Sequence, residues 1–268
     1  MVSEFAEQLS VKRLSAALSE RPFQFFETIG STNDAARDWA ARGAPSGAVV
    51  VAELQTAGRG RFGRTWHAPS GTALLFSTVL RPPSVAPVTR YTMAAAVSVR
   101  SALLDLLKSD AAVVKLKWPN DVQLHNRKVC GILIEPVWRG ALLEAIIVGI
   151  GINVRVPFDD PELSAAAINL EPYCQEQVDR AVLLADILKH LEYWSAHTQG
   201  LALFQAWRAA LSTLGKQVQI TDVSTAHRLV VGQALDVDED GALLVRTDDG
   251  KIQRVFAGEV TLQRPKTE

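Results

Sequence analysis

The chain has 268 residues, a formal net charge of −1 and 48% hydrophobic residues. These values describe an ordinary globular protein with a sizeable core, and they exclude overall charge as a means of binding nucleic acid or an anionic membrane. The two cysteines form no paired framework, which predicts a reducing, cytoplasmic location. The histidines form no zinc-ligand pattern, and every apolar run is too short to span a membrane.

The first two thirds of the chain alternate helical and strand patterns. In chain order we expect a helix at 4–20, a strand at 23–28, a helix between Ser31 and Gly43, strands at 47–53 and 72–80, a helix at 90–108, and strands at 113–117, 128–135 and 142–154. Three prolines predict that residues 155–177 are irregular, and two helices are expected at about 178–197 and 200–213. After Lys216, short β-type runs separated by Gly and Asp turns predict a small β-barrel, so we place a domain boundary near residue 215.

The most informative stretch is residues 55–66, which reads Gln-Thr-Ala-Gly-Arg-Gly-Arg-Phe-Gly-Arg-Thr-Trp. Glycine lets backbone N–H groups come close to a ligand, and arginine adds fixed positive charge with forked donors. No Asp or Glu occurs between Leu54 and Leu104, so the stretch lies in a basic region. The pattern predicts a loop that holds a phosphate or a carboxylate group.

Three other interpretations of this loop are weaker. Gly58, Gly60 and Gly63 fit the dinucleotide-binding pattern, but no helix is expected after them and no acidic residue occurs about 20 positions later. Core strands on both sides disfavour a disordered RNA-binding segment. A plain surface turn stays open on the loop alone, although glycines are costly in a turn that has no task.

Four further motifs place polar groups next to apolar strands. Ser31-Thr32-Asn33 is either a plain helix N-cap or a cap that also receives polar ligand atoms. Asn120 and Asp121 follow Lys117-Trp118-Pro119 at a strand end, where their oxygens suit an Asx turn, Mg²⁺ or a ribose hydroxyl. Lys128 extends either outward to solvent or into a pocket. Gly149-x-Gly151-x-Asn153 indicates either tight sheet packing or close approach by a ligand.

Taken in order, these motifs resemble those of the biotin protein ligases. The matching segments are a GRGRxGRxW loop at Gly58–Trp66, KWPND at Lys117–Asp121, KxxGILxE at Lys128–Glu135, GxGIN at Gly149–Asn153 and an early STN at Ser31–Asn33. The tail at Asp240–Leu244 and Gly258–Val260 looks like the small C-terminal SH3-like domain of that family. The resemblance covers about residues 23–263, and its specificity comes from several motifs in the right order.

The resemblance implies an α+β fold in which helices flank a mixed central β-sheet, of the type shared by class II synthetases and biotin and lipoate ligases. It implies a catalytic biotin- and ATP-binding domain at residues 1–214 and an SH3-like β-barrel at 215–268. It also implies a two-step, AMP-forming reaction. The carboxylate of biotin attacks the α-phosphate of ATP, which gives biotinyl-5′-AMP and pyrophosphate, and a lysine of an acceptor protein then attacks the adenylate and releases AMP.

The resemblance also implies a role for each motif residue. The implied catalytic residues are Lys128, Arg61 and Asp121, with Lys128 placed between the biotin carboxyl group and the α-phosphate. The implied biotin-binding residues are Ser31, Thr32, Asn33, Gln55, Arg59, Gly60, Arg61, Lys128 and Gly131. The implied ATP- and adenylate-binding residues are Gly58, Arg59, Arg61, Arg64, Trp66, Asn120, Lys128 and Asn153. Asp121 is the implied protein ligand of Mg²⁺.

The implied acceptor is the biotin carboxyl carrier protein of acetyl-CoA carboxylase, and the implied substrates are biotin and ATP with Mg²⁺. About 22 residues precede Phe23, so we expect a monofunctional ligase without a DNA-binding domain, with no DNA or membrane partner. A homodimer stays open, as do Gln263 and Arg264 as functional residues of the tail. The alternative functions are a lipoate–protein ligase and a non-catalytic biotin sensor.

Overall fold

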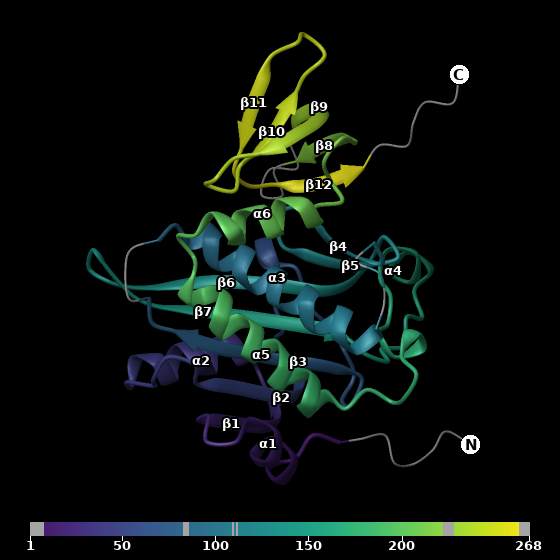
Figure 1. Cartoon of the computed structure of the whole chain (residues 1–268). Helices are drawn as coiled ribbons and strands as arrows, with labels where there is room; N and C mark the ends of the chain where they lie inside the picture. The colour runs from purple at the N-terminus through teal and green to yellow at the C-terminus, as the bar shows by residue number, and fades with distance from the viewer. Residues whose placement is uncertain (1–7, 83–85, 109, 111, 222–227, 263–268) are drawn as a thin grey trace.

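The computed structural model describes residues 8–82, 86–108, 110, 112–221 and 228–262, and it contains two β-sheets (Figure 1). The helices and strands of the larger part are α1 (Val11–Leu18), β1 (Phe23–Ile29), α2 (Thr32–Ala41), β2 (Val49–Gln55), β3 (Ala73–Leu80), α3 (Val88–Leu107), β4 (Val114–Lys117), β5 (Asp121–Leu124), β6 (Arg127–Arg139), β7 (Leu142–Asn153), α4 (Pro161–Ala166), α5 (Arg180–Ala196) and α6 (Leu201–Ala210). Two short 3₁₀ turns, at Arg61–Gly63 and Glu171–Tyr173, complete this part. In the described residues no helix is long and apolar enough to cross a membrane.

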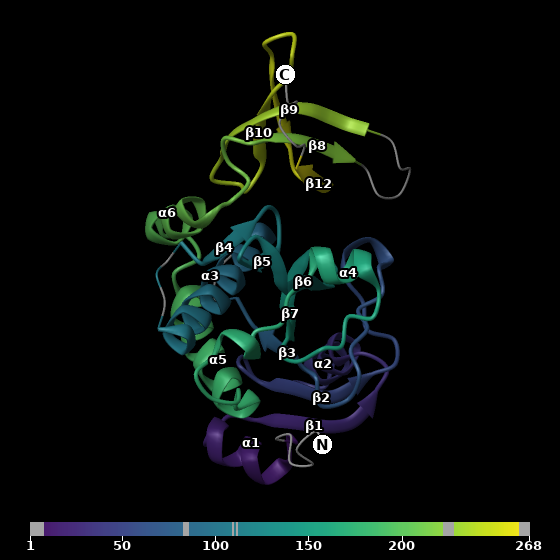
Figure 2. The same ribbon diagram turned by 90° about the vertical axis from the view of Figure 1, so that its right-hand side faces the viewer.

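The larger sheet has seven strands in the order β1-β2-β3-β7-β6-β5-β4. The pair β1–β2 is parallel and all other neighbours are antiparallel. The sheet is therefore mixed, and helices lie on both of its faces, as Figure 2 shows with α3 and α5 on one side and α2 on the other. This arrangement confirms the predicted α+β class.

The two faces of the sheet differ because side chains alternate along each strand. On β7, the main core receives Ile146, Val148, Ile150 and Ile152, which pack in the same cluster as the buried residues of α3 and α5. On the opposite face, Ala145 and Ile147 join a smaller cluster with Ala36 and Ala40 of α2. The next residues on this second face are Gly149 and Gly151, whose lack of a side chain leaves room above the strand for side chains from other segments.

The smaller sheet is antiparallel, and its strand order is β11-β10-β9-β8-β12. Its strands are β8 (Gln217–Thr221), β9 (Arg228–Val237), β10 (Leu243–Arg246), β11 (Ile252–Val255) and β12 (Glu259–Leu262). It is attached to the larger part by specific contacts: the indole Nε1 of Trp118 donates to Gly241 O at 2.9 Å, and the Arg208 guanidinium binds the Asp236 carboxylate at 2.6 and 2.8 Å. The Trp118–Pro119 peptide bond that precedes β5 is cis.

Several expected boundaries were wrong because of helix caps and contacts with distant residues. The helix expected at 4–20 begins at Val11, because Ser10 caps it and the N–H of Leu9 donates to the Glu53 carboxylate; residues 1–7 lie outside the described residues. Residues 155–177 contain α4, which Asp160 caps. The last helix ends at Ala210, because the chain then turns to β4, where Ser212 N donates to Leu116 O at 2.7 Å.

A buried ion pair connects distant parts of the larger domain. Arg180, at the start of α5, donates to both carboxylate oxygens of Glu53 at 2.8 Å, and both side chains are almost fully buried. The same carboxylate accepts from Leu9 N at 2.6 Å and from Gly71 N at 3.0 Å. Glu53 therefore ties the N-terminal segment, the entry to β3 and α5 to the end of β2.

We predict that Glu53→Ala lowers the free energy of unfolding by about 3–5 kcal/mol, because it leaves the Arg180 charge buried without its carboxylate partner. Chemical denaturation of the purified chain measures this loss. A matched control is Arg13→Ala, which breaks the exposed Arg13–Asp179 pair and should cost at most about 1 kcal/mol. Equal losses in the two variants would contradict the role assigned to Glu53.

Candidate functional site

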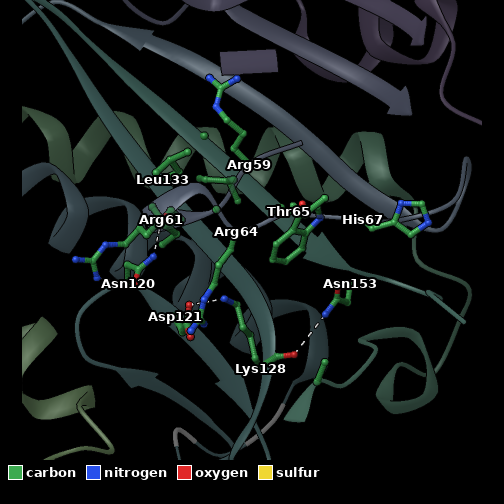
Figure 3. A pocket seen from close by; sticks show the side chains of 18 of the residues that line it. Arg59, Arg61, Arg64, Thr65, His67, Asn120, Asp121, Lys128, Leu133 and Asn153 are labelled. Carbon is green, nitrogen blue, oxygen red and sulfur yellow. Dashed lines mark hydrogen bonds and ion pairs between the residues drawn. The ribbon is translucent and has the colours of Figure 1, made fainter. Parts of the chain in front are cut away.

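A cavity of about 480 Å³ lies on the open face of the larger sheet, and Figure 3 shows part of its lining. It is bounded by the first half of β6, by the end of β7, by the start of α2, by the Gly/Arg loop (residues 58–66) and by the segment that leads to α4. Gly258, Glu259 and Val260 at the start of β12 also line it, so the smaller sheet contributes to its wall.

Glycines make room for two side chains on the cavity floor. Gly131 and Gly151 are register partners on β6 and β7, and a Cβ atom added at either would lie 2.8 Å from the indole of Trp66. A Cβ atom added at Gly149 would lie 2.2 Å from Asn33 Oδ1. The GxGIN motif therefore lets Trp66 and Asn33 rest directly on the sheet, which explains why glycines occupy buried strand positions.

The polar residues at the start of α2 form a connected group. Ser31 is the N-cap by position, but its side chain makes no capping hydrogen bond. Gln55 Oε1 accepts from Thr32 N at 2.8 Å and from Thr32 Oγ1 at 3.0 Å. Asn33 Nδ2 donates to Glu135 Oε2 at 2.7 Å. Ser31, Thr32 and Asn33 are all buried and line the cavity, so the motif does more than cap a helix.

The three arginines of the Gly/Arg loop extend to three different parts of the molecule. Arg59 binds both carboxylate oxygens of Asp34 on α2, at 2.6 and 2.7 Å, and this contact holds the pKa of the Asp34 carboxyl below its usual range. Arg61 donates to Asn120 Oδ1 at 3.3 Å, and Arg64 pairs with Glu259 of β12. In Figure 3, Arg59 points away from the contacts made by Arg61 and Arg64.

A second basic group lies along β4–β6. Lys128 Nζ is 2.7 Å from Asp121 Oδ1, a contact drawn in Figure 3. The same Nζ is 5.6 Å from the centre of the Trp66 ring. Burial lowers the pKa of Lys117, and the nearby charges of Lys128 and Arg64 lower it further, against the opposing effect of Asp121 and Glu259. Burial also lowers the pKa of Arg61. Cations held this close together by the fold favour an anionic ligand, whose charge would offset their repulsion and desolvation.

The fold brings almost all of the residues predicted for the site to this one cavity. The predicted residues that line it are Ser31, Thr32, Asn33, Gln55, Arg59, Gly60, Arg61, Arg64, Trp66, Asn120, Asp121, Lys128, Gly131 and Asn153. Gly58 is the exception. It does not line the cavity. Its carbonyl oxygen accepts a hydrogen bond from Trp66 N at 2.9 Å, which closes the base of the loop.

Sequence reasoning missed several lining residues. No role is predicted for Lys117 of the KWPND motif, although a lysine at a strand end within a polar motif is itself a signal; the structure places it half-buried in the cavity lining. Glu259 lies in the tail motif, where Gln263 and Arg264 were considered instead; those two lie outside the described residues. Phe158, just before α4, and Leu163, within α4, had no signal because the segment was expected to be irregular.

Comparison with known proteins gives consistent matches along the chain. The model of the Biotin/lipoate A/B protein ligase family matches residues 25–153, and that of the Biotin protein ligase C terminal domain matches residues 213–262. The biotin--[acetyl-CoA-carboxylase] ligase of Paracoccus denitrificans is 34% identical over 228 residues, which cover 82% of this chain and 92% of the relative. The Mycobacterium tuberculosis protein of the same name is 33% identical over 255 residues, which cover 92% of this chain and 91% of the relative.

Solved structures agree with the sequence matches. The biotin protein ligase from Aquifex aeolicus in complex with biotin and ATP is 27% identical, covers 91% of this chain and 99% of its own, and superposes with a TM-score of 0.75. The fold and the position of the motifs thus define a ligase of the mixed-sheet class with a small C-terminal β domain. The chain belongs to the biotin/lipoate A/B protein ligase family, with the C-terminal domain typical of biotin protein ligases.

We predict that Gly151→Ala displaces Trp66 and loosens the Gly/Arg loop, because the new Cβ atom would overlap the indole. Overpacking of this kind costs about 1–3 kcal/mol, and the loop can relieve it by opening. Tryptic cleavage within residues 58–66 should then accelerate by about fivefold or more when opening is fast relative to cleavage. Limited proteolysis measures the rate.

The matched control is Gly30→Ala, where an added Cβ atom meets no atom within 4 Å. This variant should be cleaved in the loop at the wild-type rate. An unchanged cleavage rate in Gly151→Ala would show that Trp66 does not hold the loop on the sheet.

Proposed function

We propose that the chain is an ATP-dependent biotin–[acetyl-CoA-carboxylase] ligase. It activates biotin to biotinyl-5′-AMP and then transfers the biotinyl group to a lysine of the biotin carboxyl carrier protein. The observation that carries the proposal is the composition of one cavity. Its buried polar residues at the start of α2 suit the neutral ureido ring of biotin, and its cluster of cations suits the biotin carboxylate and the phosphates of ATP. The lining cations are Arg59, Arg61, Arg64, Lys117 and Lys128.

The first step joins two anionic reactants, so it depends on positive charge more than on a base. Lys128 is the proposed central group: its ammonium would contact both the biotin carboxylate and the α-phosphate. Asp121 holds this ammonium at 2.7 Å, within the cavity lining and 5.6 Å from the centre of the Trp66 ring. As the α-phosphate gains charge during attack, a fixed ammonium stabilises the transition state more than the ground state.

Other lining residues would bind the nucleotide and the ring of biotin. We propose Arg61, Lys117 and Arg64 for the phosphates, and Asn120 and Asn153 for groups of the nucleotide. Thr32, Asn33, Gln55 and Ser31 would contact the ureido ring of biotin, whose donors and acceptors need partners when buried. Arg59 would contribute mainly through Asp34, because its guanidinium is already bound there.

Mg²⁺ is proposed as the metal that accompanies ATP. In the described residues, no group of three or more His, Cys, Asp or Glu side chains could hold a metal ion. Mg²⁺ in nucleotide sites is commonly bound by substrate phosphates, waters and one or two carboxylates, so Asp121 alone suits it. When bound, the ion would supply additional charge compensation at the phosphates.

The second step needs an acceptor lysine to reach the adenylate. The biotin carboxyl carrier protein of acetyl-CoA carboxylase is proposed from the names of the relatives. We also propose that residues 1–214 form the catalytic unit and 215–268 the C-terminal unit, in the cytoplasm. Glu259 and its neighbours would then place part of the second unit in the wall of the first unit's site.

The proposal is tested by ATP–pyrophosphate exchange in the presence of biotin. We expect exchange that requires biotin and is not supported by lipoate, and isothermal titration should show binding of biotin in preference to lipoate. Exchange that follows lipoate would instead indicate a lipoate–protein ligase. Biotin binding without exchange would indicate a non-catalytic sensor.

We predict that Lys128→Ala lowers biotin-dependent exchange by about 10²–10³-fold, the usual effect of removing a charge that contacts the transition state. The matched control is Lys115→Ala, a lysine on β4 that does not line the cavity, which should exchange at the wild-type rate. Near-normal exchange by Lys128→Ala would contradict the role assigned to this ammonium.

A further inference from the structure

Two polar side chains lie behind the wall of the cavity and do not line it: Ser77 on β3 and Glu135 on β6. Ser77 is fully buried, and its Oγ lies 2.7 Å from Thr32 Oγ1 and 2.6 Å from Asn33 Oδ1. Glu135 accepts from Asn33 Nδ2 at 2.7 Å. Ser77 therefore contacts both Thr32 and Asn33, the two residues of α2 that line the cavity, and Glu135 contacts Asn33.

The chemistry of these groups fixes the direction of each hydrogen bond. An ionised carboxylate only accepts, so Asn33 must present its Nδ2 to Glu135 and its Oδ1 to Ser77. An amide oxygen also only accepts, so the hydroxyl proton of Ser77 is directed to Asn33. The Ser77 oxygen that faces Thr32 can then act as an acceptor.

The hydroxyl proton of Thr32 is consequently directed toward the protein and away from the cavity. Its hydroxyl has two acceptors on the protein side, Ser77 Oγ and Gln55 Oε1, at 2.7 and 3.0 Å. The oxygen of Gln55 is itself oriented by Thr32 N, which donates to it at 2.8 Å. A ligand that meets the Thr32 hydroxyl from the cavity therefore meets a lone pair and has to donate a hydrogen.

The surroundings of Glu135 and Asn33 favour these hydrogen-bond directions. Two guanidinium groups lie beside the Glu135 carboxylate, that of Arg37 at 2.9 Å and that of Arg59 at 3.7 Å. Asn33 is buried and rests on Gly149. A flip of its amide would place an oxygen against the Glu135 carboxylate and the NH₂ group against Ser77 Oγ, which costs the buried charge-assisted hydrogen bond to Glu135.

We propose that Ser77 and Glu135 are positioning residues. They fix the orientation of the Asn33 amide and the direction of the Thr32 hydroxyl proton, so that this part of the cavity recognises an N–H donor of the bound ligand. The inference rests on the proposed function, in which that donor is a ureido N–H of biotin. Neither residue touches the ligand or the reacting atoms. Both act through the residues that do.

The test measures biotin affinity by isothermal titration, together with the KM values for biotin and ATP in pyrophosphate exchange. Ser77→Ala and Glu135→Ala should each weaken biotin binding by about tenfold or more, because each leaves a buried polar group without its partner. The KM for ATP and the rate at saturating biotin should change less than about threefold. Glu135→Gln should bind biotin almost as the wild type does, because its amide oxygen can accept from Asn33 Nδ2.

Glu144→Ala is the matched control, since Glu144 on β7 also pairs with an arginine, Arg139, but lies outside the cavity. It should leave biotin affinity unchanged. Wild-type affinity in both alanine variants, an equal rise in the KM for ATP, or a Glu135→Gln variant as weak as Glu135→Ala would overturn the inference. If the wild-type chain itself neither binds biotin nor catalyses exchange, the proposed function fails instead, so the two failures are distinguishable.

Discussion

The alternation of side chains along β7 is the constraint on which the rest of the structure depends. One face of this central strand carries Ile146, Val148, Ile150 and Ile152, which bind α3 and α5 to the sheet. The other face changes from Ala145 and Ile147 to Gly149 and Gly151, so it first packs against α2 and then leaves room for Asn33 and Trp66 on the cavity floor. Core and cavity are thus two sides of one strand, and neither can be altered without effects on the other.

The charges around this floor follow a consistent arrangement. Cations of the loop and of β4–β6 line the cavity, and three of them are held by a carboxylate or an amide: Arg59 by Asp34, Arg61 by Asn120, and Lys128 by Asp121. These partners fix the donors in place before a ligand arrives, which reduces reorganisation during the reaction. The contact between Arg64 and Glu259 extends this arrangement to the smaller sheet.

Much of the fold could be predicted, because periodic patterns of apolar residues indicate helices and strands. The strands at 23–28 and 142–154 and the long helix at 90–108 were found within a few residues of their true bounds. The failures occurred where a distant residue decided the local conformation. Leu9 N donates to the Glu53 carboxylate, and the first helix begins only after this contact. Ser212 N donates to Leu116 O, and the last helix of the larger part ends before this contact.

The sequence by itself determined the family, the motif residues and the basic character of the loop, because these depend on residue type and order. Tertiary structure decided how those residues are used. It directed Arg59 to Asp34 and away from Arg61 and Arg64, kept Gly58 out of the cavity, and brought Ser77, Glu135 and Glu259 to the site from three separate strands. Such contacts join residues far apart in the chain, so their geometry follows from strand order and register, which no local pattern contains.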